Sequence, residues 1–369
     1  MASKDVQKSR VLNNEDEKRL RQISDLYVPH PKMVHTIGEV RRSIERATRD
    51  RHLTLLVGPT GVGKTTAWQQ LEREYAVNAA GDPSPDRLGS LYVRLEAKAG
   101  AYRAASLDRV LLLAADEPLI ERKQILPGKP GRRTMSLSGT NEGRRRALLN
   151  VLRIRRPSAL VIDEAQHFGY LTGRGAELAL DDLKTLADSS DVPLLFIGTY
   201  AMARFGSLSG QLARRTNDVH FARYDGRTEN WRAFLSTLKY LASHVSFAFD
   251  PLEDEAARYL YAGCLGCIGL LTRWLVRSYE GCLRSGRDAI RRGDLDAERW
   301  QAGKLARQLD DVQAGERTMA DLEGDFDALY ESLGLPTERQ SKHKGSKPGL
   351  RNPVRDAVGT FGAPQARSA

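Results

Sequence analysis

The chain has few cysteines. Cys264, Cys267 and Cys282 are the only ones, and this odd, low count does not describe a disulfide framework but fits a reducing cytoplasm. Cys264 and Cys267 form a C-x-x-C pair, yet a zinc site usually needs a second such pair or nearby histidines, and the neighbouring sequence offers neither. The apolar, glycine-containing surroundings of the pair favour a helix face of small residues instead.

Long hydrophobic runs are also missing. No stretch approaches the roughly 18 apolar residues that mark a membrane span. Residues 1–14 are polar and charged, without the apolar segment of a signal peptide. We therefore expect a cytoplasmic protein without membrane contact.

Positive charge, by contrast, is in excess. The 57 lysine and arginine residues outnumber the 47 aspartate and glutamate residues, which gives a formal net charge of +10 at pH 7. An excess of this size favours an anionic partner, of which nucleic acid is the commonest. The alternative is a soluble protein whose basic residues gather in a tail.

The order of apolar segments predicts the fold. Short apolar runs that predict strands lie at 53–57, 91–95, 159–162, 194–197 and 219–221, and helical periodicity separates them at about 33–49, 65–75, 106–115, 142–156 and 175–188. After these, only helices are predicted, at about 229–244, 252–262, 267–285 and 297–331. This order indicates an α/β fold with a parallel sheet flanked by helices, followed by a small helical lid.

Four regions follow from this pattern and from the local composition. They are a flexible charged arm at 1–20, the α/β core at 21–226, the helical lid at 227–333 and a disordered basic tail at 334–369. The tail is predicted to be disordered because it is rich in Gly, Pro, Ser, Lys and Arg and has few large apolar residues.

The sequence Gly58-Pro-Thr-Gly-Val-Gly-Lys-Thr65 fits the phosphate-binding pattern G-x-x-x-x-G-K-[ST] at every fixed position, with a predicted strand before it and a predicted helix after it. Backbone N–H groups of such a loop point inward and hold phosphate oxygens, helped by the partial positive charge of the helix N-terminus. We therefore predict ATP and Mg²⁺ as cofactors, with Lys64 at the β- and γ-phosphates and the Thr65 hydroxyl on the metal ion. The predicted nucleotide-binding residues of the loop are Gly58, Pro59, Thr60, Gly61, Val62, Gly63, Lys64, Thr65 and Thr66.

Two carboxylates end a later predicted strand. Asp163 and Glu164 directly follow the apolar residues 159–162, at the carboxyl edge where open α/β sheets bind ligands. Asp163 is placed to hold Mg²⁺ and Glu164 to act as general base on the attacking water; the alternative is a solvated acidic strand end. Thr199, at the end of the next predicted strand, is either a contact to the γ-phosphate or an ordinary turn residue. Together with Lys64, these residues predict an ATPase.

The order of these motifs resembles an AAA+ ATPase with a P-loop core, and within that group the transposition regulators of the TnsC and TniB family, which are related to MuB. The resemblance spans about residues 25–285. It rests on Pro29-His-Pro31, Val57-Gly-Pro-Thr-Gly-Val-Gly-Lys-Thr-Thr66, Val161-Ile-Asp-Glu-Ala-Gln-His167, Phe196-Ile-Gly-Thr199 and Gln211-Leu-Ala-Arg-Arg215. The long stretch between Lys64 and Asp163 departs from the family pattern.

The resemblance implies a function. Such proteins bind ATP between subunits and assemble on duplex DNA as rings or helical filaments. They recruit the transposase, in some systems with a target-selecting adaptor protein, and come apart when ATP is hydrolysed. For this chain the resemblance implies a bacterial cytoplasmic location and ATP-dependent self-association on DNA.

The same resemblance assigns roles to particular residues. Arg214 or Arg215 would be an arginine finger that reaches the γ-phosphate held by a neighbouring subunit. Arg273 would be a sensor arginine that contacts the nucleotide; its alternative is a solvent-facing helix residue. Residues 28–31 would flank the adenine, mostly through backbone atoms.

Candidate DNA contacts come from clusters of positive charge. Lys98, Tyr102 and Arg103 follow the second predicted strand, where related filament proteins place DNA-facing residues, and Arg144 and Arg145 lie on a predicted helix. Phosphate contacts by such groups are collectively strong, salt-dependent and independent of base sequence. The alternative for each is a solvated surface residue.

Two other functions share the predicted pocket. A helicase-like motor would need a second RecA-like core, and the region after residue 229 offers no predicted strands for one. A nucleotide-gated loader or signalling switch would use the same ATP site without any link to transposition.

Overall fold

The computed structural model describes residues 10–50, 53–82, 86–96, 104–120, 141–170, 182–186, 188–204 and 216–335. The chain divides into two compact units, Met1–Met319 and Ala320–Ala369. All the described strands and most of the described helices belong to the first unit.

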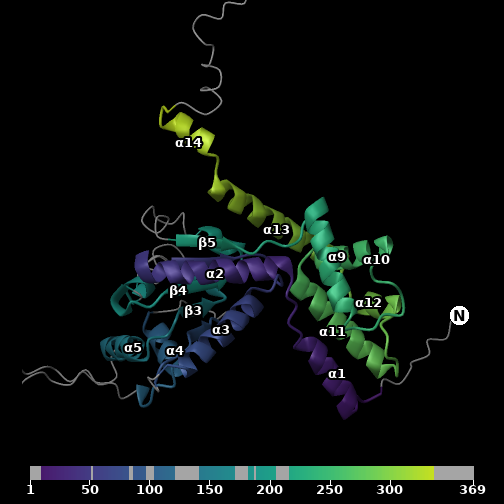
Figure 1. Cartoon of the computed structure of the whole chain (residues 1–369), viewed down its shortest axis with the longest axis horizontal. Coiled ribbons are helices and arrows are strands. Elements are labelled where there is room, and N and C mark those ends of the chain that lie inside the picture. The colour runs from purple at the N-terminus through teal and green to yellow at the C-terminus, as the bar shows by residue number, and fades with distance from the viewer. Residues whose placement is uncertain are drawn as a thin grey trace, which may run out of the picture. The chain divides into compact units, whose positions relative to one another are not determined.

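A five-stranded parallel sheet organises the first unit (Figure 1). Its strands are β1 (Leu53–Val57), β2 (Leu91–Arg94), β3 (Leu160–Asp163), β4 (Leu194–Gly198) and β5 (Thr216–His220), in the spatial order β2-β3-β4-β1-β5. β1 pairs with both β4 and β5, and all five of its residues are buried. Parallel strands that are covered on both faces consist of nearly continuous apolar residues. For this reason the short apolar runs in the sequence predict these strands. The predicted α/β fold with a parallel sheet is confirmed.

Helices α2 (Pro31–Asp50) and α3 (Lys64–Ala80) cover one face of the sheet (Figure 1). Their apolar side chains share a buried cluster with Leu56 of β1, Val161 of β3 and Leu195 of β4. Since α3 begins directly after the glycine-rich loop, this packing fixes the helix N-terminus at the carboxyl end of β1.

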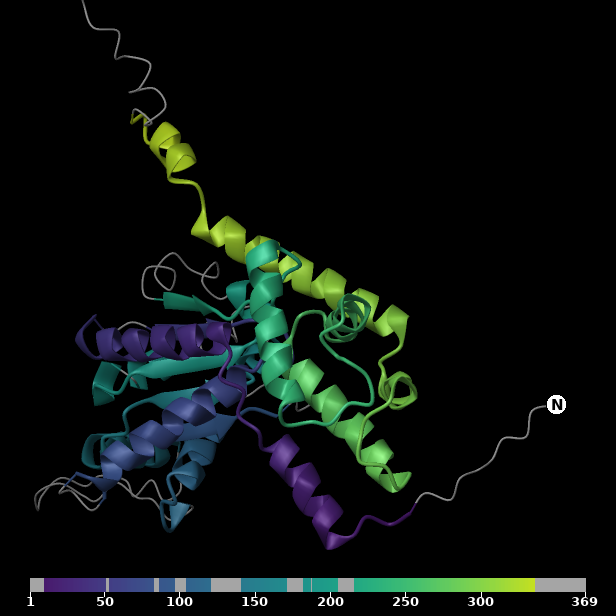
Figure 2. The ribbon, with the colours of Figure 1, turned by 45° about the vertical axis from the view of Figure 1, so that its right-hand side comes forward.

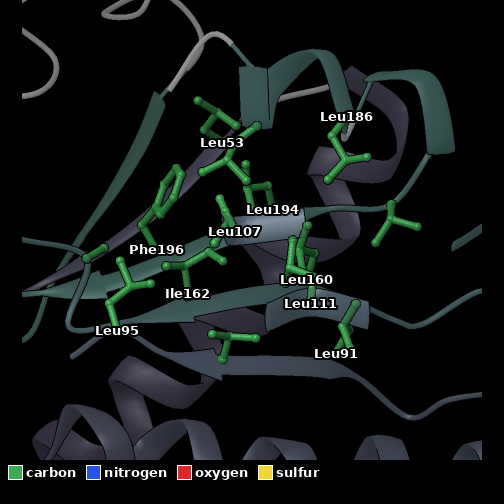
Figure 3. Close-up of a cluster of buried hydrophobic side chains, with 14 of the residues drawn as sticks. Leu53, Leu91, Leu95, Leu107, Leu111, Leu160, Ile162, Leu186, Leu194 and Phe196 are labelled. Atoms are coloured by element: carbon green, nitrogen blue, oxygen red, sulfur yellow. The ribbon is translucent and has the colours of Figure 1, made fainter. Parts of the chain in front are cut away.

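Helices α4 (Ala104–Ala114) and α5 (Asn141–Arg155) cover the opposite face. Figure 3 shows part of the apolar cluster there, which includes Leu55 of β1, Ile162 of β3 and Phe196 of β4. Successive residues of a strand point to opposite faces. Each central strand therefore contributes side chains to both clusters and packs against helices on both faces.

Residues 14–20, expected above to belong to a flexible arm, are helical instead. They are part of α1 (Asn14–Ser24). Asn13 and Asp16 form a capping box, with the Asn13 side chain accepting from the Asp16 N–H at 2.7 Å and the Asp16 side chain accepting from the Asn13 N–H at 3.2 Å. Ile23 is buried, and α1 packs against a later helix, α11 (Ile268–Arg284). The cap and the packing stabilise a helix that the charged composition of this segment did not indicate.

The predicted helical region after the sheet is confirmed. It begins with α9 (Thr228–Ala242), α10 (Asp254–Cys264), α11 and α12 (Arg292–Glu298), which lie beside the sheet (Figure 2). Phe234 and Trp274 are fully buried in their shared apolar cluster. Cys264 and Cys267 lie in the same cluster, at the corner between α10 and α11.

The continuous helix expected at 297–331 is wrong. The chain instead forms α12, then α13 (Ala302–Glu323), then α14 (Phe326–Ser332). Gly324 adopts a φ of +64°, which breaks α13, and the Asp325 side chain accepts from the Asp327 N–H at 2.9 Å and so starts a new helix. Helical periodicity continues across this break, so the sequence pattern alone does not reveal it.

The remaining helical segments are short. They are η2 (Ala165–Tyr170), η3 (Tyr200–Arg204) and the helical residues 182–186 and 188–190. Residues 182–186 fall within the helix predicted at 175–188, and the segment 188–190 extends two residues beyond it. In the part of the chain that the structure describes, no single helix combines the length and hydropathy of a membrane span, although α10 and α11 meet that test together as a pair bent by 105°.

Candidate active site

The loop between β1 and α3 has the backbone geometry of a phosphate site. Gly61 and Gly63 have φ angles of +79° and +114°, in the region that favours glycine. Gly63 is also the N-cap residue of α3. Because glycine has no side chain to cap the helix, the N–H groups of the first turn remain available to an anion.

Lys64 is held against this loop. Its Nζ donates to the carbonyl oxygens of Gly58 at 2.8 Å and Pro59 at 2.9 Å. Burial lowers the pKa of Lys64 to about 8, while Glu164 and Asp163 act in the opposite direction. A triphosphate beside Nζ would add full negative charges and raise this pKa again.

Thr65 and Asp163, which the sequence predicts to share a metal ion, are in direct contact. Asp163 Oδ2 accepts from Thr65 Oγ1 at 2.9 Å, and Asp163 Oδ1 accepts from the Glu164 N–H at 2.8 Å. The Tyr92 hydroxyl donates to the same Oδ2 at 2.8 Å. Burial and the nearby Asp163 carboxylate raise the pKa of Tyr92, so the hydroxyl stays protonated. Tyr92, which sequence reasoning missed, therefore orients the carboxylate.

Glu164 lies just beyond the end of β3 and has a φ of +55°, a conformation that few residues other than glycine adopt. Its Oε1 accepts from the Arg94 guanidinium at 3.2 Å, and its Oε2 accepts from the Gln166 side-chain amide. The Thr199 N–H donates to Gln166 Oε1 at 3.2 Å. Gln166 thus ties the end of β4 to the predicted general base, and Arg94 occupies the other carboxylate oxygen.

These groups line a cleft of about 810 Å³, a volume typical of ligand sites. The loop contributes residues 60–66, the sheet contributes Arg94, Asp163, Glu164 and Thr199, the segment before α2 contributes residues 24–28 with His30, and α11 contributes Ile268, Gly269, Thr272, Arg273, Val276 and Arg277. The cleft therefore lies between the α/β core and the helical lid.

The lid touches the phosphate loop directly. The Leu270 N–H of α11 donates to the Gly61 carbonyl oxygen at 3.0 Å. A Cβ on Gly269 would lie 2.6 Å from that same oxygen, so a glycine is needed for this close approach. Arg273 lies one helical turn further along α11 and faces the cleft, although it is an exposed residue.

The arrangement fits ATP with Mg²⁺. Free first-turn amides and one lysine face the place of the phosphates, and a hydroxyl and a buried carboxylate, Thr65 Oγ1 and Asp163 Oδ2, meet at the place of the metal ion. Oxygen ligands of this kind are those that Mg²⁺ prefers. Thr65 and Asp163 would hold the ion, which would spread the negative charge of the phosphates during hydrolysis.

The structure brings together predicted residues from distant parts of the sequence. Residues 60–66, Asp163, Glu164, Thr199 and Arg273 all line the cleft, and Gly58 and Pro59 receive the hydrogen bonds of Lys64. The roles assigned to these residues stay predictions. Residues that sequence reasoning missed are Tyr92, Arg94 and Gln166; of these, Gln166 carried a signal, because it follows the two carboxylates in the sequence. Val28 and His30, from the segment predicted to flank the adenine, also line the cleft.

Two of the predicted DNA contacts, Arg144 and Arg145, are not among the residues that line the cleft. Arg144 donates to the Asn141 side chain at 2.8 Å, and Arg145 forms ion pairs with Asp108 at 3.2 Å and with Asp182. These intramolecular pairs compete with any role of Arg145 in phosphate binding, and DNA contact at both arginines stays a prediction. Lys98, Tyr102, Arg103, Arg214 and Arg215 lie outside the described residues.

Comparison with known proteins agrees with this site. Residues 46–204 match the family model of the AAA domain. No curated protein matches the chain. The matched region contains the phosphate loop, Asp163 and Glu164, so the chain carries an AAA domain and is an ATPase.

Several solved structures are similar to the chain. Cdc6p from Pyrobaculum aerophilum is 15% identical, with 76% of this chain and 68% of that chain covered and a TM-score of 0.45. A Walker-type ATPase of Pyrococcus abyssi is 18% identical, with 78% and 73% covered and a TM-score of 0.43. Drosophila ORC bound to AT-rich DNA and Cdc6 is 14% identical, with 77% and 44% covered and a TM-score of 0.44.

Proposed function

Starting from the AAA domain at residues 46–204, we propose that the chain is a regulatory ATPase that assembles on duplex DNA when it holds ATP, and that this assembly recruits and activates a transposase. Hydrolysis then takes the assembly apart. The motifs that resemble the TnsC and TniB family support the transposition part of the proposal, and the net charge of +10 supports the DNA part.

The ion pair between Arg94 and Glu164 is the observation that carries the proposal. Glu164 is the candidate general base, and a general base must be free to accept a proton from the attacking water. In the structure one of its oxygens is bound to the Arg94 guanidinium, 3.2 Å away. The site is therefore assembled but restrained, as expected for a regulated ATPase.

Arg94 connects this restraint to DNA. It is the last residue of β2, and the predicted DNA contacts Lys98, Tyr102 and Arg103 follow within ten residues. The Arg94 side chain is 63% exposed, and such exposed pairs contribute only about 0.2–1 kcal/mol. DNA phosphates near this strand end would compete for Arg94 and release Glu164, so hydrolysis would accelerate on DNA.

Hydrolysis itself would use residues already in place. The amides of the loop and the ammonium of Lys64 would bind the triphosphate, and Glu164 would take the proton of the attacking water. Arg214 or Arg215 of a neighbouring copy would stabilise the charge that develops on the γ-phosphate, an effect typically worth about 10³–10⁵ in rate. Assembly and hydrolysis would then be coupled, because only an assembled subunit receives the arginine.

Electron microscopy of the protein with duplex DNA and a non-hydrolysable ATP analogue tests the assembly. We expect rings or filaments for the wild type and for Lys239→Ala, a control at an exposed lysine of α9. Lys64→Ala should fail to assemble, because it removes the charge that binds the phosphates. Wild-type protein that stays monomeric on DNA with the analogue would contradict the proposal.

Three further measurements distinguish this function from the alternative functions. With ATP, Glu164→Gln should form assemblies that persist while wild-type assemblies disperse, since the variant binds ATP but lacks the base. A strand-separation assay should show no unwinding, whereas unwinding would indicate a motor. Capture of a candidate transposase by the DNA-loaded, analogue-bound protein tests the transposition part; capture that needs neither ATP analogue nor DNA would refute it.

A further inference from the structure

The helix α14, in the second unit of the chain, exposes an apolar face. Phe326, Leu329, Tyr330 and Leu333 follow the i, i+3, i+4, i+7 spacing that brings side chains to one side of a helix. All four are exposed, Phe326 to 69% and Leu333 to 62%, and α14 has no buried residue. A helix of seven residues is marginal in water by itself. A surface that covers the apolar face would therefore stabilise α14.

The segment around α14 is acidic, although the whole chain has a net charge of +10. The acidic residues between positions 321 and 335 are Asp321, Glu323, Asp325, Asp327 and Glu331, and the same stretch contains no lysine or arginine. Negative charge of this density repels DNA phosphates, which excludes duplex DNA as the partner of α14. A surface that suits α14 combines apolar side chains with positive charge.

The helix α5, in the first unit, carries such a surface on the side that faces away from the sheet. Arg146, Asn150, Arg153 and Ile154 recur at i, i+4, i+7 and i+8, and all four are exposed. Ile154, the apolar member, is 67% exposed. Between residues 144 and 156 the sequence has six arginines and no acidic residue. We call these four exposed residues the basic stripe.

A hollow of about 750 Å³ adjoins the basic stripe. Arg153 belongs to the stripe and also lines the hollow, together with Arg156 and with residues 157–158 and 192–193, which lead into β3 and β4. The hollow therefore lies at the amino edge of the sheet. Glu164 and Thr199 of the ATP cleft follow the carboxyl ends of the same two strands, so the stripe is remote from the nucleotide site.

We propose that α14 of one copy of the chain docks on the basic stripe of a second copy. The apolar face of α14 covers Ile154, and the carboxylates around it pair with the arginines. Both surfaces are exposed within a single chain, so each remains available to another molecule. The exposed isoleucine favours a protein over DNA as the occupant of the stripe, because phosphates offer it no apolar contact.

The difference between the two surfaces determines the kind of assembly. A contact between two unlike surfaces of identical chains is head-to-tail, and it leaves one free α14 and one free basic stripe at the ends. Further copies can therefore add, which is the property that rings and filaments need. This inference goes beyond the proposed function: none of the stripe residues lines the ATP cleft, so the contact forms without ATP or DNA.

Sedimentation velocity of the full-length protein, without ATP and without DNA, tests the proposal. Concentrations up to about 500 µM are needed, because an interface of this size is weak. We expect the wild type to self-associate reversibly. The association should weaken as salt is added, since salt screens the charges of the two surfaces.

Two variants each remove one side of the contact. Phe326→Gln with Leu329→Gln removes apolar area from α14 and keeps a good helix propensity. Arg146→Glu with Ile154→Glu reverses a charge and removes the apolar member of the basic stripe. Each variant should weaken self-association by about tenfold or more, the factor that corresponds to burial of one large apolar side chain.

Matched controls change exposed residues of the lid in the same way. Leu252→Gln and Lys239→Glu should self-associate as the wild type does. Thermal melts establish that each variant is folded. Ile154→Gln alone takes the place of the stripe variant if the charge reversal unfolds the protein.

A mixture of the α14 variant and the stripe variant gives the sharpest test. The first keeps an intact basic stripe and the second keeps an intact α14. Together they should form one-to-one dimers with about the wild-type affinity, and nothing larger, because neither exposes a second usable surface. A direct contact between two copies of α14 would not produce this pairing.

Three results would overturn the proposal. They are a wild type that stays monomeric over the whole range, a mixture that does not dimerise, and a stripe variant that self-associates like the wild type. In the last case, a loss of DNA affinity in the same variant would identify the stripe as a DNA surface. None of these results bears on ATP-dependent assembly, which electron microscopy with the ATP analogue tests separately.

Discussion

Removal of Arg94 should release the restraint on Glu164. In the structure the two side chains form an ion pair at 3.2 Å, with 63% of the arginine side chain and 30% of the glutamate side chain exposed. The Arg94→Ala variant leaves Glu164 with its Gln166 contact only. We therefore expect a higher ATPase rate without DNA and a weaker stimulation by DNA.

The expected size follows from the exposure of the pair. Ion pairs that are open to solvent contribute about 0.2–1 kcal/mol. If the ion pair must break before reaction, its full free energy adds to the activation barrier. Loss of the pair in Arg94→Ala then raises the basal kcat by about 1.4- to 5-fold. The stimulation by duplex DNA should shrink by the same factor, because DNA would no longer have a restraint to relieve.

Phosphate release at saturating ATP, measured with and without duplex DNA, tests this. Arg87→Ala is the matched control, because Arg87 also forms a partly exposed ion pair, with Asp82 at 2.6 Å, and lies outside the cleft lining. Its rates should equal those of the wild type. A basal rate for Arg94→Ala at or below the wild-type value, together with unchanged DNA stimulation, would refute the role of Arg94.

Three other expectations concern the cleft. Tyr92→Phe removes a donor to Asp163 and should raise the Mg²⁺ concentration for half-maximal ATPase activity by about tenfold or more; an unchanged Mg²⁺ dependence would exclude the orienting role. Since the pKa of Lys64 is lowered to about 8 in the free protein and the charged form binds phosphate, ATP affinity should be full below this pH and fall by up to about tenfold per unit above it. A binding constant that stays flat up to pH 9.5 would contradict this sign. Gly269→Ala places a Cβ 2.6 Å from the Gly61 carbonyl oxygen and should lower stability by about 1–3 kcal/mol in a thermal melt. Gly281→Ala on the same helix, with open space around it, should not.

The parts of the fold that sequence could predict are those with local causes. The interior strands β1, β3 and β4 are apolar because helices cover both of their faces. The phosphate loop is readable because its glycines are needed for backbone geometry at fixed spacing. Asp163 and Glu164 were found because the end of a buried strand is where such groups must lie.

The parts that sequence could not predict depend on contacts between distant residues. The His30–Tyr224 hydrogen bond joins residues 194 positions apart, and the bond from Tyr92 to Asp163 spans 71 positions. No periodicity or spacing marks such pairs. The bond from Tyr92 to Asp163, for example, forms only because the sheet order sets β2 beside β3. The helix α1 was missed for another reason. Its residues are mostly polar and charged, which suggested a flexible arm, although Asn13 followed by Asp16 three residues later is a capping-box pattern that indicates a helix start.

Calorimetric titration of the protein with ATP in the presence of Mg²⁺ tests the central claim, which is that the loop before α3 and Asp163 together hold a magnesium-bound triphosphate. We expect saturable binding to the wild type and no detectable binding to Lys64→Ala at the same concentrations, since that variant keeps the loop but lacks the ammonium group. Wild-type protein that takes up no nucleotide, or a Lys64→Ala variant that binds ATP as tightly as the wild type, would contradict the account.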